Sequence, residues 1–116
     1  MATDLEELRA KLREFSSARD WDQFHSPKNL AMALSAEAGE LLEVFQWLTE
    51  EQSARLDKVS RAAASDELAD VLLYLVRLAD TLGVDLLAEA RRKLAENERK
   101  YPVDKARGTA KKYTEL

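Results

Sequence analysis

The chain has 116 residues and a net charge of −4 at pH 7, with 46% hydrophobic and 34% charged residues. These values indicate one globular domain, and they exclude the broadly basic surface of a protein that binds a nucleic-acid polymer. The absence of cysteine excludes disulfides, thiolate catalysis and cysteine-ligated zinc. Since no apolar run reaches the roughly 18 residues of a membrane span and the charged N-terminus lacks a signal-peptide core, we expect a cytoplasmic protein with no membrane partner.

Capping residues mark the first two expected helices. No segment alternates apolar and polar residues as a β-strand would. This absence predicts an all-α chain. Thr3 with Glu6 forms a capping-box pattern that starts a helix over about residues 4–17. Ser26 can cap a second helix over about residues 27–48, and the proline that follows it suits the first helical position.

The third and fourth helices are separated by a glycine. The third helix is expected over residues 60–82, after a polar connection, with Gly83 as the left-handed residue that ends it. Asp85 can cap the fourth helix, which ends near residue 100 because Tyr101-Pro102 stops it.

The third helix is apolar on more than one side. Leu73 and Val76 lie well off the face that its other apolar residues share, and a helix that is apolar nearly all round is buried nearly all round. One short chain cannot cover such a helix on every side. We therefore expect residues 1–102 to form a four-helix bundle that is completed by oligomerisation, with residues 103–116 as a polar C-terminal tail. The shared face consists of Leu68, Leu72, Leu75, Ala79 and Leu82.

Four acidic residues interrupt these apolar helices. Glu37 projects into the middle of the apolar face of the second helix, and Glu40, three residues on, is its neighbour. Glu67 and Asp70 repeat this spacing on the third helix, where basic residues are scarce. A divalent cation would resolve the repulsion, because four carboxylates supply the oxygen ligands that suit Mg²⁺ or Mn²⁺. The apolar face around Glu37 is made by Leu30, Leu34, Leu41, Val44 and Leu48.

Each acidic pair also has an ordinary explanation. Most pairs at this spacing line solvated faces, and the helix dipole favours Glu67 and Asp70 early in their helix. The central position of Glu37, and the recurrence of the spacing in the most apolar helix, favour the metal site. The lone His25 cannot by itself make a nitrogen-ligated zinc site.

Two further groups of side chains are candidates for substrate binding. Trp47 projects on the same side of its helix as Glu40, where an indole could stack on a nucleobase; the alternative for each aromatic residue is core packing. Lys93, Asn97 and Lys100 share one face of the fourth helix and suit phosphate oxygens, but a solvated surface explains them too, since acidic residues interleave. The aromatic group is Trp21, Phe24, His25 and Trp47.

The segment "EAGELLEVFQW" followed by "DELADVLLYL" resembles the MazG-like all-α nucleoside triphosphate pyrophosphohydrolases, whose signature is ExxE on one helix and ExxD on the next. The similarity to the dCTP pyrophosphatase branch spans nearly the whole chain, through "DWDQFHSPKNL", "NERKYP" and "KYTEL". The chain departs from the family at Leu12, where the family carries histidine, and in a slightly shorter connection between the acidic helices. The residues that match the signature are Glu37, Glu40, Glu67 and Asp70.

The resemblance implies a homotetramer, as a dimer of dimers, that cleaves between the α- and β-phosphates and releases a nucleoside monophosphate and pyrophosphate. It implies that the four acids bind Mg²⁺ and that Trp21 and Trp47 line the base pocket, with His25 and Tyr74 close by. It further implies substrate contacts from Lys93, Asn97 and Tyr101, from the same or a neighbouring subunit.

The function predicted from the sequence is therefore Mg²⁺-dependent hydrolysis of dCTP, or of modified forms such as 5-methyl-dCTP, that clears aberrant nucleotides. Either Glu37 or Glu40 would orient or deprotonate the attacking water. One alternative keeps the chemistry and takes dUTP or many nucleoside triphosphates, because stacking suits every base. A second alternative is a helical oligomerisation module without catalysis.

Overall fold

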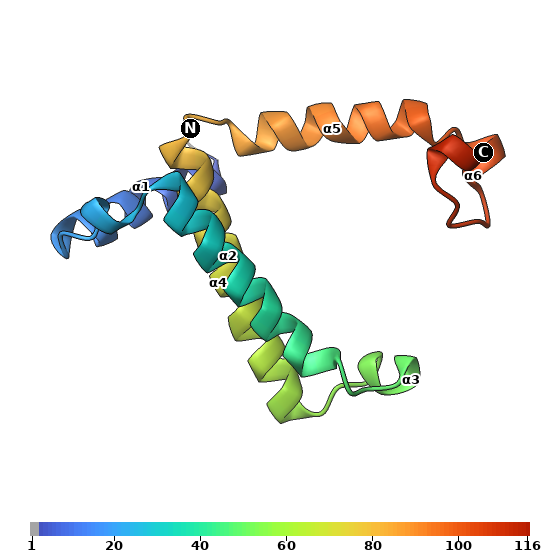
Figure 1. The fold of residues 1–116 in the computed structure, drawn as a ribbon, viewed down its shortest axis with the longest axis horizontal. Coiled ribbons are helices and arrows are strands. Elements are labelled where there is room, and N and C mark those ends of the chain that lie inside the picture. Colours follow the sequence, from blue (N-terminus) through green and yellow to red (C-terminus); the bar gives the residue numbers. More distant parts are fainter. Residues whose placement is uncertain (1–2) are drawn as a thin grey trace. The chain divides into compact units, whose positions relative to one another are not determined.

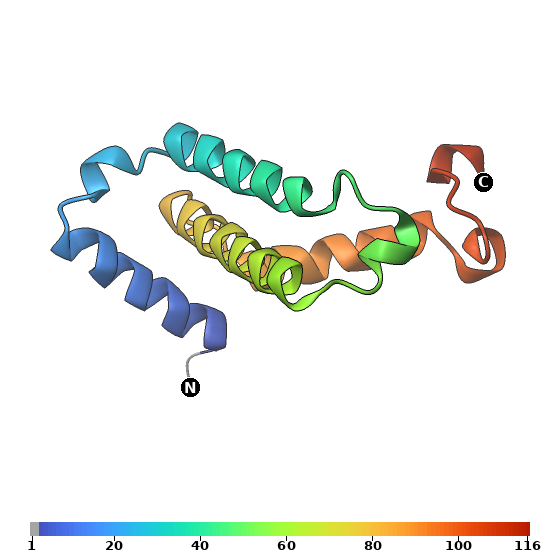
Figure 2. The same ribbon diagram turned by 90° about the horizontal axis from the view of Figure 1, so that it is seen from below.

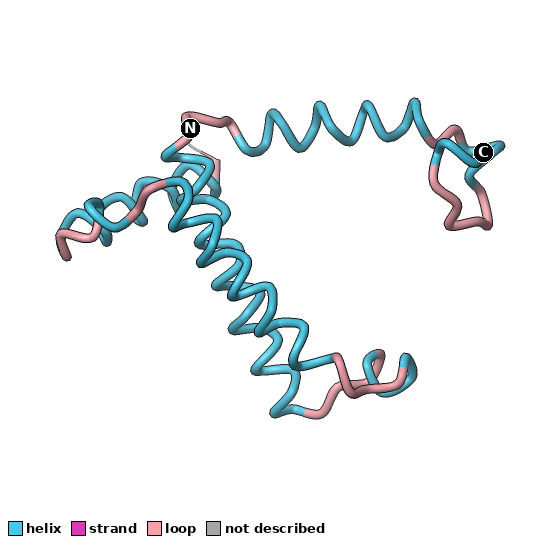
Figure 3. The backbone as a smooth tube through the Cα atoms, viewed as in Figure 1, coloured by secondary structure: helices cyan, strands magenta, loops and turns pink. Residues whose placement is uncertain are grey.

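The computed structural model describes residues 3–116, and every regular element in that range is a helix (Figure 3). The all-α prediction is confirmed. None of these helices is long and apolar enough to cross a membrane. The elements are α1 (Asp4–Ala18), η1 (Asp22–Phe24), α2 (Pro27–Phe45), α3 (Glu50–Ser53), α4 (Lys58–Thr81), α5 (Leu86–Lys100), α6 (Val103–Ala106) and η2 (Tyr113–Glu115).

The described chain forms two compact units, one up to Val84 and one from Asp85 to Leu116. In the first unit, α2 and α4 run antiparallel along each other, and α1 packs against α4 near the end of α4 (Figures 1 and 2). Leu30, which is 1% exposed, and three residues of α4 form the buried apolar core. The three α4 residues are Ala64, Val76 and Ala79.

Local capping explains where α2 and α4 begin and end. The Ser26 hydroxyl accepts from the Asn29 backbone N–H, as predicted. The second helix ends at Phe45, three residues short of the prediction, because Thr49 caps a separate turn, α3. The third predicted helix, α4, starts two residues before the predicted start, because Asp57 supplies its cap. It ends at Thr81, and Gly83 just beyond it has the expected left-handed conformation, with φ of +67°.

The second unit consists of α5 and a folded C-terminal segment. Asp85 caps α5, which ends before Pro102 as predicted. The segment expected as a polar tail contains α6 and η2, and the Tyr113 ring meets the Tyr101 ring edge-on with centroids 6.0 Å apart. The Lys100 ammonium lies 4.8 Å from the Tyr113 ring centroid. The C-terminal residues therefore cover the end of α5; a domain boundary after residue 102 stays a prediction.

Candidate metal and nucleotide site

Three of the predicted metal ligands lie together between α2 and α4. Glu37, Glu67 and Asp70 each offer a carboxylate oxygen within 4.8 Å of the others. The antiparallel packing of the two helices brings the two sequence motifs opposite each other. One oxygen of Glu37 and one of Glu67, both Oε2, are buried without a hydrogen-bond partner.

The cluster carries uncompensated negative charge. Among the described residues, no ion pair reaches any of the four predicted ligands. The neighbouring Glu37 carboxyl, which can share a proton with Glu67, raises the pKa of Glu67 to about 7, together with burial and the negative charge of Glu40. Buried, unpartnered carboxylate oxygens of this kind fit a divalent cation with oxygen ligands.

Glu40 occupies a different position from the other three acids. It is exposed, whereas Glu37, Glu67 and Asp70 are half-buried. It lies with Glu67 in an open depression that Glu43, Val44 and Ala63 also line. A carboxylate there can face both the cluster and solvent.

A pocket of about 220 Å³ adjoins the acidic cluster. Trp21, His25 and Tyr74, which were all predicted as substrate-binding residues, line this pocket, and so does Asp70. An apolar aromatic cavity that shares a wall with a cluster of carboxylates suits a ligand with a flat ring and a charged, metal-binding end. The other lining residues are Leu12, Phe15, Ser16, Leu73 and Arg77.

A tight turn directs Trp21 towards the pocket. Asp20 adopts the left-handed conformation, with φ of 55°, and the Trp21 backbone N–H donates to the Ser16 carbonyl at 2.9 Å. The indole then packs edge-on against the rings of Phe15 and His25. Aspartate tolerates this backbone better than most residues, which explains its place between α1 and η1.

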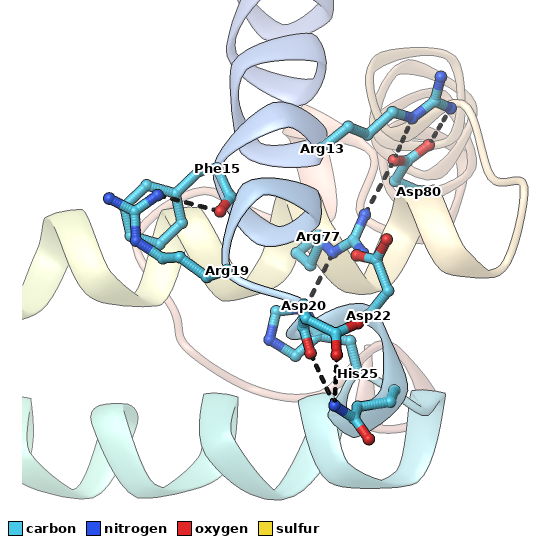
Figure 4. A network of polar contacts seen from close by, with 9 residues as sticks. Arg13, Phe15, Arg19, Asp20, Asp22, His25, Arg77 and Asp80 are labelled. Atoms are coloured by element: carbon cyan, nitrogen blue, oxygen red, sulfur yellow. Dashed lines mark hydrogen bonds and ion pairs between the residues drawn. The ribbon is translucent and has the colours of Figure 1, made fainter.

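Sequence reasoning did not assign Arg77 to the site. Arg77 lines the pocket, and its guanidinium donates to His25 and Asp22 (Figure 4). The signal was present in the spacing, because Arg77 lies seven residues after Asp70 and therefore on the same face of α4. Phe15 had no comparable signal, since its contact with Trp21 depends on the turn at Asp20.

Two predicted aromatic residues lie away from this pocket. Trp47 is 86% exposed and follows α2, whereas His25 precedes it. The 19 residues of α2 span about 27 Å, so one chain does not bring Trp21 and Trp47 together. Phe24 is also exposed and does not line the pocket.

Three further predicted residues, Lys93, Asn97 and Tyr101, belong to the second unit, whereas the four acids belong to the first. Glu96 shares their helix, and its carboxylate lies 2.9 Å from Lys100 and 3.4 Å from Lys93. Lys100 and Lys93 lower the pKa of Glu96 to about 2. The cations of α5 are therefore partly neutralised within their own helix.

Comparison with known proteins decides the family. The MazG-like family matches residues 32–116, which include all four acids and the whole second unit. The chain belongs to the MazG-like family. The resemblance predicted from the two acidic motifs is thereby confirmed.

Proteins of known name or known structure are similar over most of this chain. The dCTP pyrophosphatases 1 of Bos taurus and Mus musculus are 46% and 47% identical to it, over 97% of this chain and 68% and 67% of their own lengths. The crystal structure of a pyrophosphatase from Archaeoglobus fulgidus is 40% identical, with a TM-score of 0.82 over 88% of this chain and 95% of that chain. The MazG-like pyrophosphatase fold predicted from the sequence is confirmed.

Proposed function

We propose that this MazG-like protein hydrolyses dCTP, and modified forms such as 5-methyl-dCTP, to the monophosphate and pyrophosphate. The observation that carries the proposal is the shared wall at Asp70, where an aromatic pocket meets a cluster of carboxylates. The names of the similar dCTP pyrophosphatases support the choice of substrate. Removal of aberrant pyrimidine nucleotides in the cytoplasm is the role that such a reaction serves.

The acids would hold Mg²⁺, for which Mn²⁺ could substitute. Glu37, Glu67 and Asp70 offer the clustered oxygens. We assign Glu40, which lines the open depression together with Glu67, as the fourth ligand. A metal held there would supply positive charge to neutralise the triphosphate and Lewis-acid polarisation of the scissile phosphate. Among the four, Glu40 is the exposed carboxylate, so it is best placed to orient the attacking water and take its proton.

The pocket would hold the base, with Trp21 and Tyr74 as apolar walls and His25 as a polar group. We assign phosphate contacts to Lys93, Asn97 and Tyr101. Trp47 lies about one length of α2 from the pocket that Trp21 lines in the same chain. We therefore assign Trp47, together with the exposed Phe24, to a site that another subunit completes.

A homo-oligomer, most simply a tetramer built as a dimer of dimers, would cover the apolar surface of the first unit. Leu68 and Leu72 of α4 and Leu42 of α2 are exposed in the single chain, with Leu68 at 57%. Large apolar side chains along paired helices are typical of subunit interfaces.

A substrate panel tests the proposal. Purified protein is incubated with dCTP, 5-methyl-dCTP, dUTP, dTTP and dATP, with and without Mg²⁺, and the products are separated by chromatography. We expect monophosphate and pyrophosphate only with metal, and fastest from the deoxycytidine substrates. Equal rates on all bases would support the broad-range alternative, and no cleavage would support a non-catalytic oligomerisation module.

Two substitutions test the residue roles. Asp70→Asn and Glu40→Gln should each lower kcat at least about 100-fold, because each removes a group that acts on the reacting phosphate or water. Glu51→Gln, an exposed acid in α3, is the matched control and should keep wild-type turnover. Wild-type turnover in Asp70→Asn would contradict the metal assignment.

A further inference from the structure

The only histidine of the chain is held by an arginine in the wall of the pocket. The Arg77 Nε–H donates to His25 Nδ1 at 3.1 Å (Figure 4). A guanidinium is always protonated and has no acceptor, so Nδ1 must present its lone pair. The neutral ring then carries its proton on Nε2.

The arginine is itself held by two carboxylates. Its Nη2 donates to Asp22 Oδ1 at 2.8 Å, and its Nη1 lies 3.6 Å from Asp80 Oδ2. Asp80 is held in turn by Arg13, whose Nε donates to the same carboxylate at 2.6 Å. The side chains of Arg77 and Asp80 are only 11% and 6% exposed. The direction of the Nε–H bond to His25 is therefore set by α1, η1 and α4 together.

The environment of this imidazole disfavours its protonation. Burial and the positive charge of Arg77 lower the pKa of His25, while Asp22 opposes them. Among residues 3–116 the ring makes only the bond to Arg77, so its Nε2–H has no protein partner. His25 and Arg77 both line the 220 Å³ pocket.

We propose that Arg77 is a positioning residue that fixes His25 as an Nε2–H donor for the acceptor edge of a pyrimidine base. The inference rests on the proposed function and names a determinant of its base preference. O2 accepts hydrogen bonds in both cytosine and uracil, but N3 accepts only in cytosine, because N3 of uracil carries a proton. A fixed Nε2–H donor directed at N3 therefore favours cytosine, whereas an imidazole free to change tautomer could also accept from the N3–H of uracil.

The first test needs no activity. In the wild-type protein at pH 8, long-range ¹H–¹⁵N correlation of the single imidazole should show a protonated Nε2 and an unprotonated Nδ1. In Arg77→Gln we expect averaged nitrogen signals with a larger share of the Nδ1–H form. A wild-type ring protonated on Nδ1, or an unchanged tautomer in Arg77→Gln, would overturn the proposal.

The second test is a double-mutant cycle on substrate kinetics. Arg77→Gln should raise the KM for dCTP about 3- to 10-fold, the worth of one hydrogen bond, with kcat within about twofold. It should also reduce the preference for dCTP over dUTP. In a His25→Ala background the same change should add little, because Arg77 acts through His25. Additive effects would show that Arg77 acts by another route and would overturn the proposal.

Arg61→Gln is the matched control, because it removes an exposed guanidinium from the same helix, α4, that takes no part in the network around His25. It should leave the His25 tautomer and the KM for dCTP unchanged. The two proposals fail in different ways. If the wild type does not cleave dCTP, the proposed function fails whatever the tautomer is; if it cleaves dCTP while His25 and Arg77 act additively, only the positioning role fails.

Discussion

At the scale of single residues, the acids between α2 and α4 oppose the folding of the metal-free chain. Glu37 and Glu67 each bury a carboxylate oxygen that no donor satisfies. An unpartnered buried acceptor costs about 1–3 kcal/mol, more when it is charged. The site therefore stores unfavourable energy that binding of a cation would release.

Replacing Glu67 by glutamine should raise the stability of the metal-free protein. The neutral amide removes a like charge and can donate to Glu37, so the free energy of unfolding should rise. Chemical denaturation in EDTA measures this value, and Mg²⁺ should then stabilise the variant less than the wild type. Glu51→Gln serves as the control, and a less stable Glu67→Gln protein would contradict the expectation.

Replacing Asp80 by asparagine should weaken the contact of α1 with α4 and change its pH dependence. The hydrogen bond from Arg13, with the charges of Arg13, Arg9 and Arg77, holds the pKa of Asp80 below its usual value, and burial only partly opposes this. A lowered pKa contributes stability above the unfolded-state pKa of about 4, and that contribution is lost as the pH falls through the folded-state value.

The Asp80→Asn protein should therefore be less stable than the wild type by about 2 kcal/mol at pH 7, and the difference should shrink below about pH 4. Urea titrations at pH 7, 5 and 3 measure it. A difference that stays constant down to pH 3 would show that the carboxylate charge is unimportant there.

At the scale of elements, local signals explain the helix ends well. Ser26, Gly83 and Asp85 were predicted in the roles that the structure gives them, because a cap or a left-handed residue acts only on its own neighbours. The errors arose where two signals compete within a few residues. Thr49 with Gln52 outcompetes continuation of α2, and Asp57 caps α4 ahead of the predicted start.

The C-terminal segment gives an element-scale prediction. Tyr113 covers Tyr101 and Lys100, so Tyr113→Ala should let the last turn of α5 fray. Amide exchange over residues 97–101 should become about tenfold faster, the equivalent of roughly 1.4 kcal/mol, and the KM for dCTP should rise. Thr114→Ala is the exposed control in the same turn. Unchanged exchange in Tyr113→Ala would show that the segment does not support α5.

At the scale of the whole molecule, many large apolar side chains remain exposed around a small buried core. The fully buried apolar residues are few, while Leu68 and Leu72 remain exposed on α4. Although α1 and α2 both pack against α4, part of its apolar surface stays uncovered within the first unit. We propose the other subunits as the remaining cover.

Leu68→Glu should therefore reduce the assembly to smaller species, because it places a charge in an apolar interface. Light scattering coupled to size-exclusion chromatography measures the mass, and wild type should be about four times the 13.1 kDa chain under the tetramer proposal. Arg55→Glu, in the exposed connection after α3, should keep the wild-type mass. A monomeric wild type would refute the oligomer, and a Leu68→Glu protein of wild-type mass would place the interface elsewhere.

The sequence by itself determined the helical class, most helix ends and the four acids, because periodicity, caps and motif spacing act over a few residues. Tertiary structure decided what lies together across the helices. The α2–α4 packing clusters Glu37, Glu67 and Asp70 and leaves Glu40 exposed, although all four share one motif spacing. The packing of α1, η1 and α4 likewise joins Arg77 to His25, fifty-two residues away, and separates Trp47 from Trp21. Contacts between such distant positions depend on how whole helices pack, which no local pattern encodes.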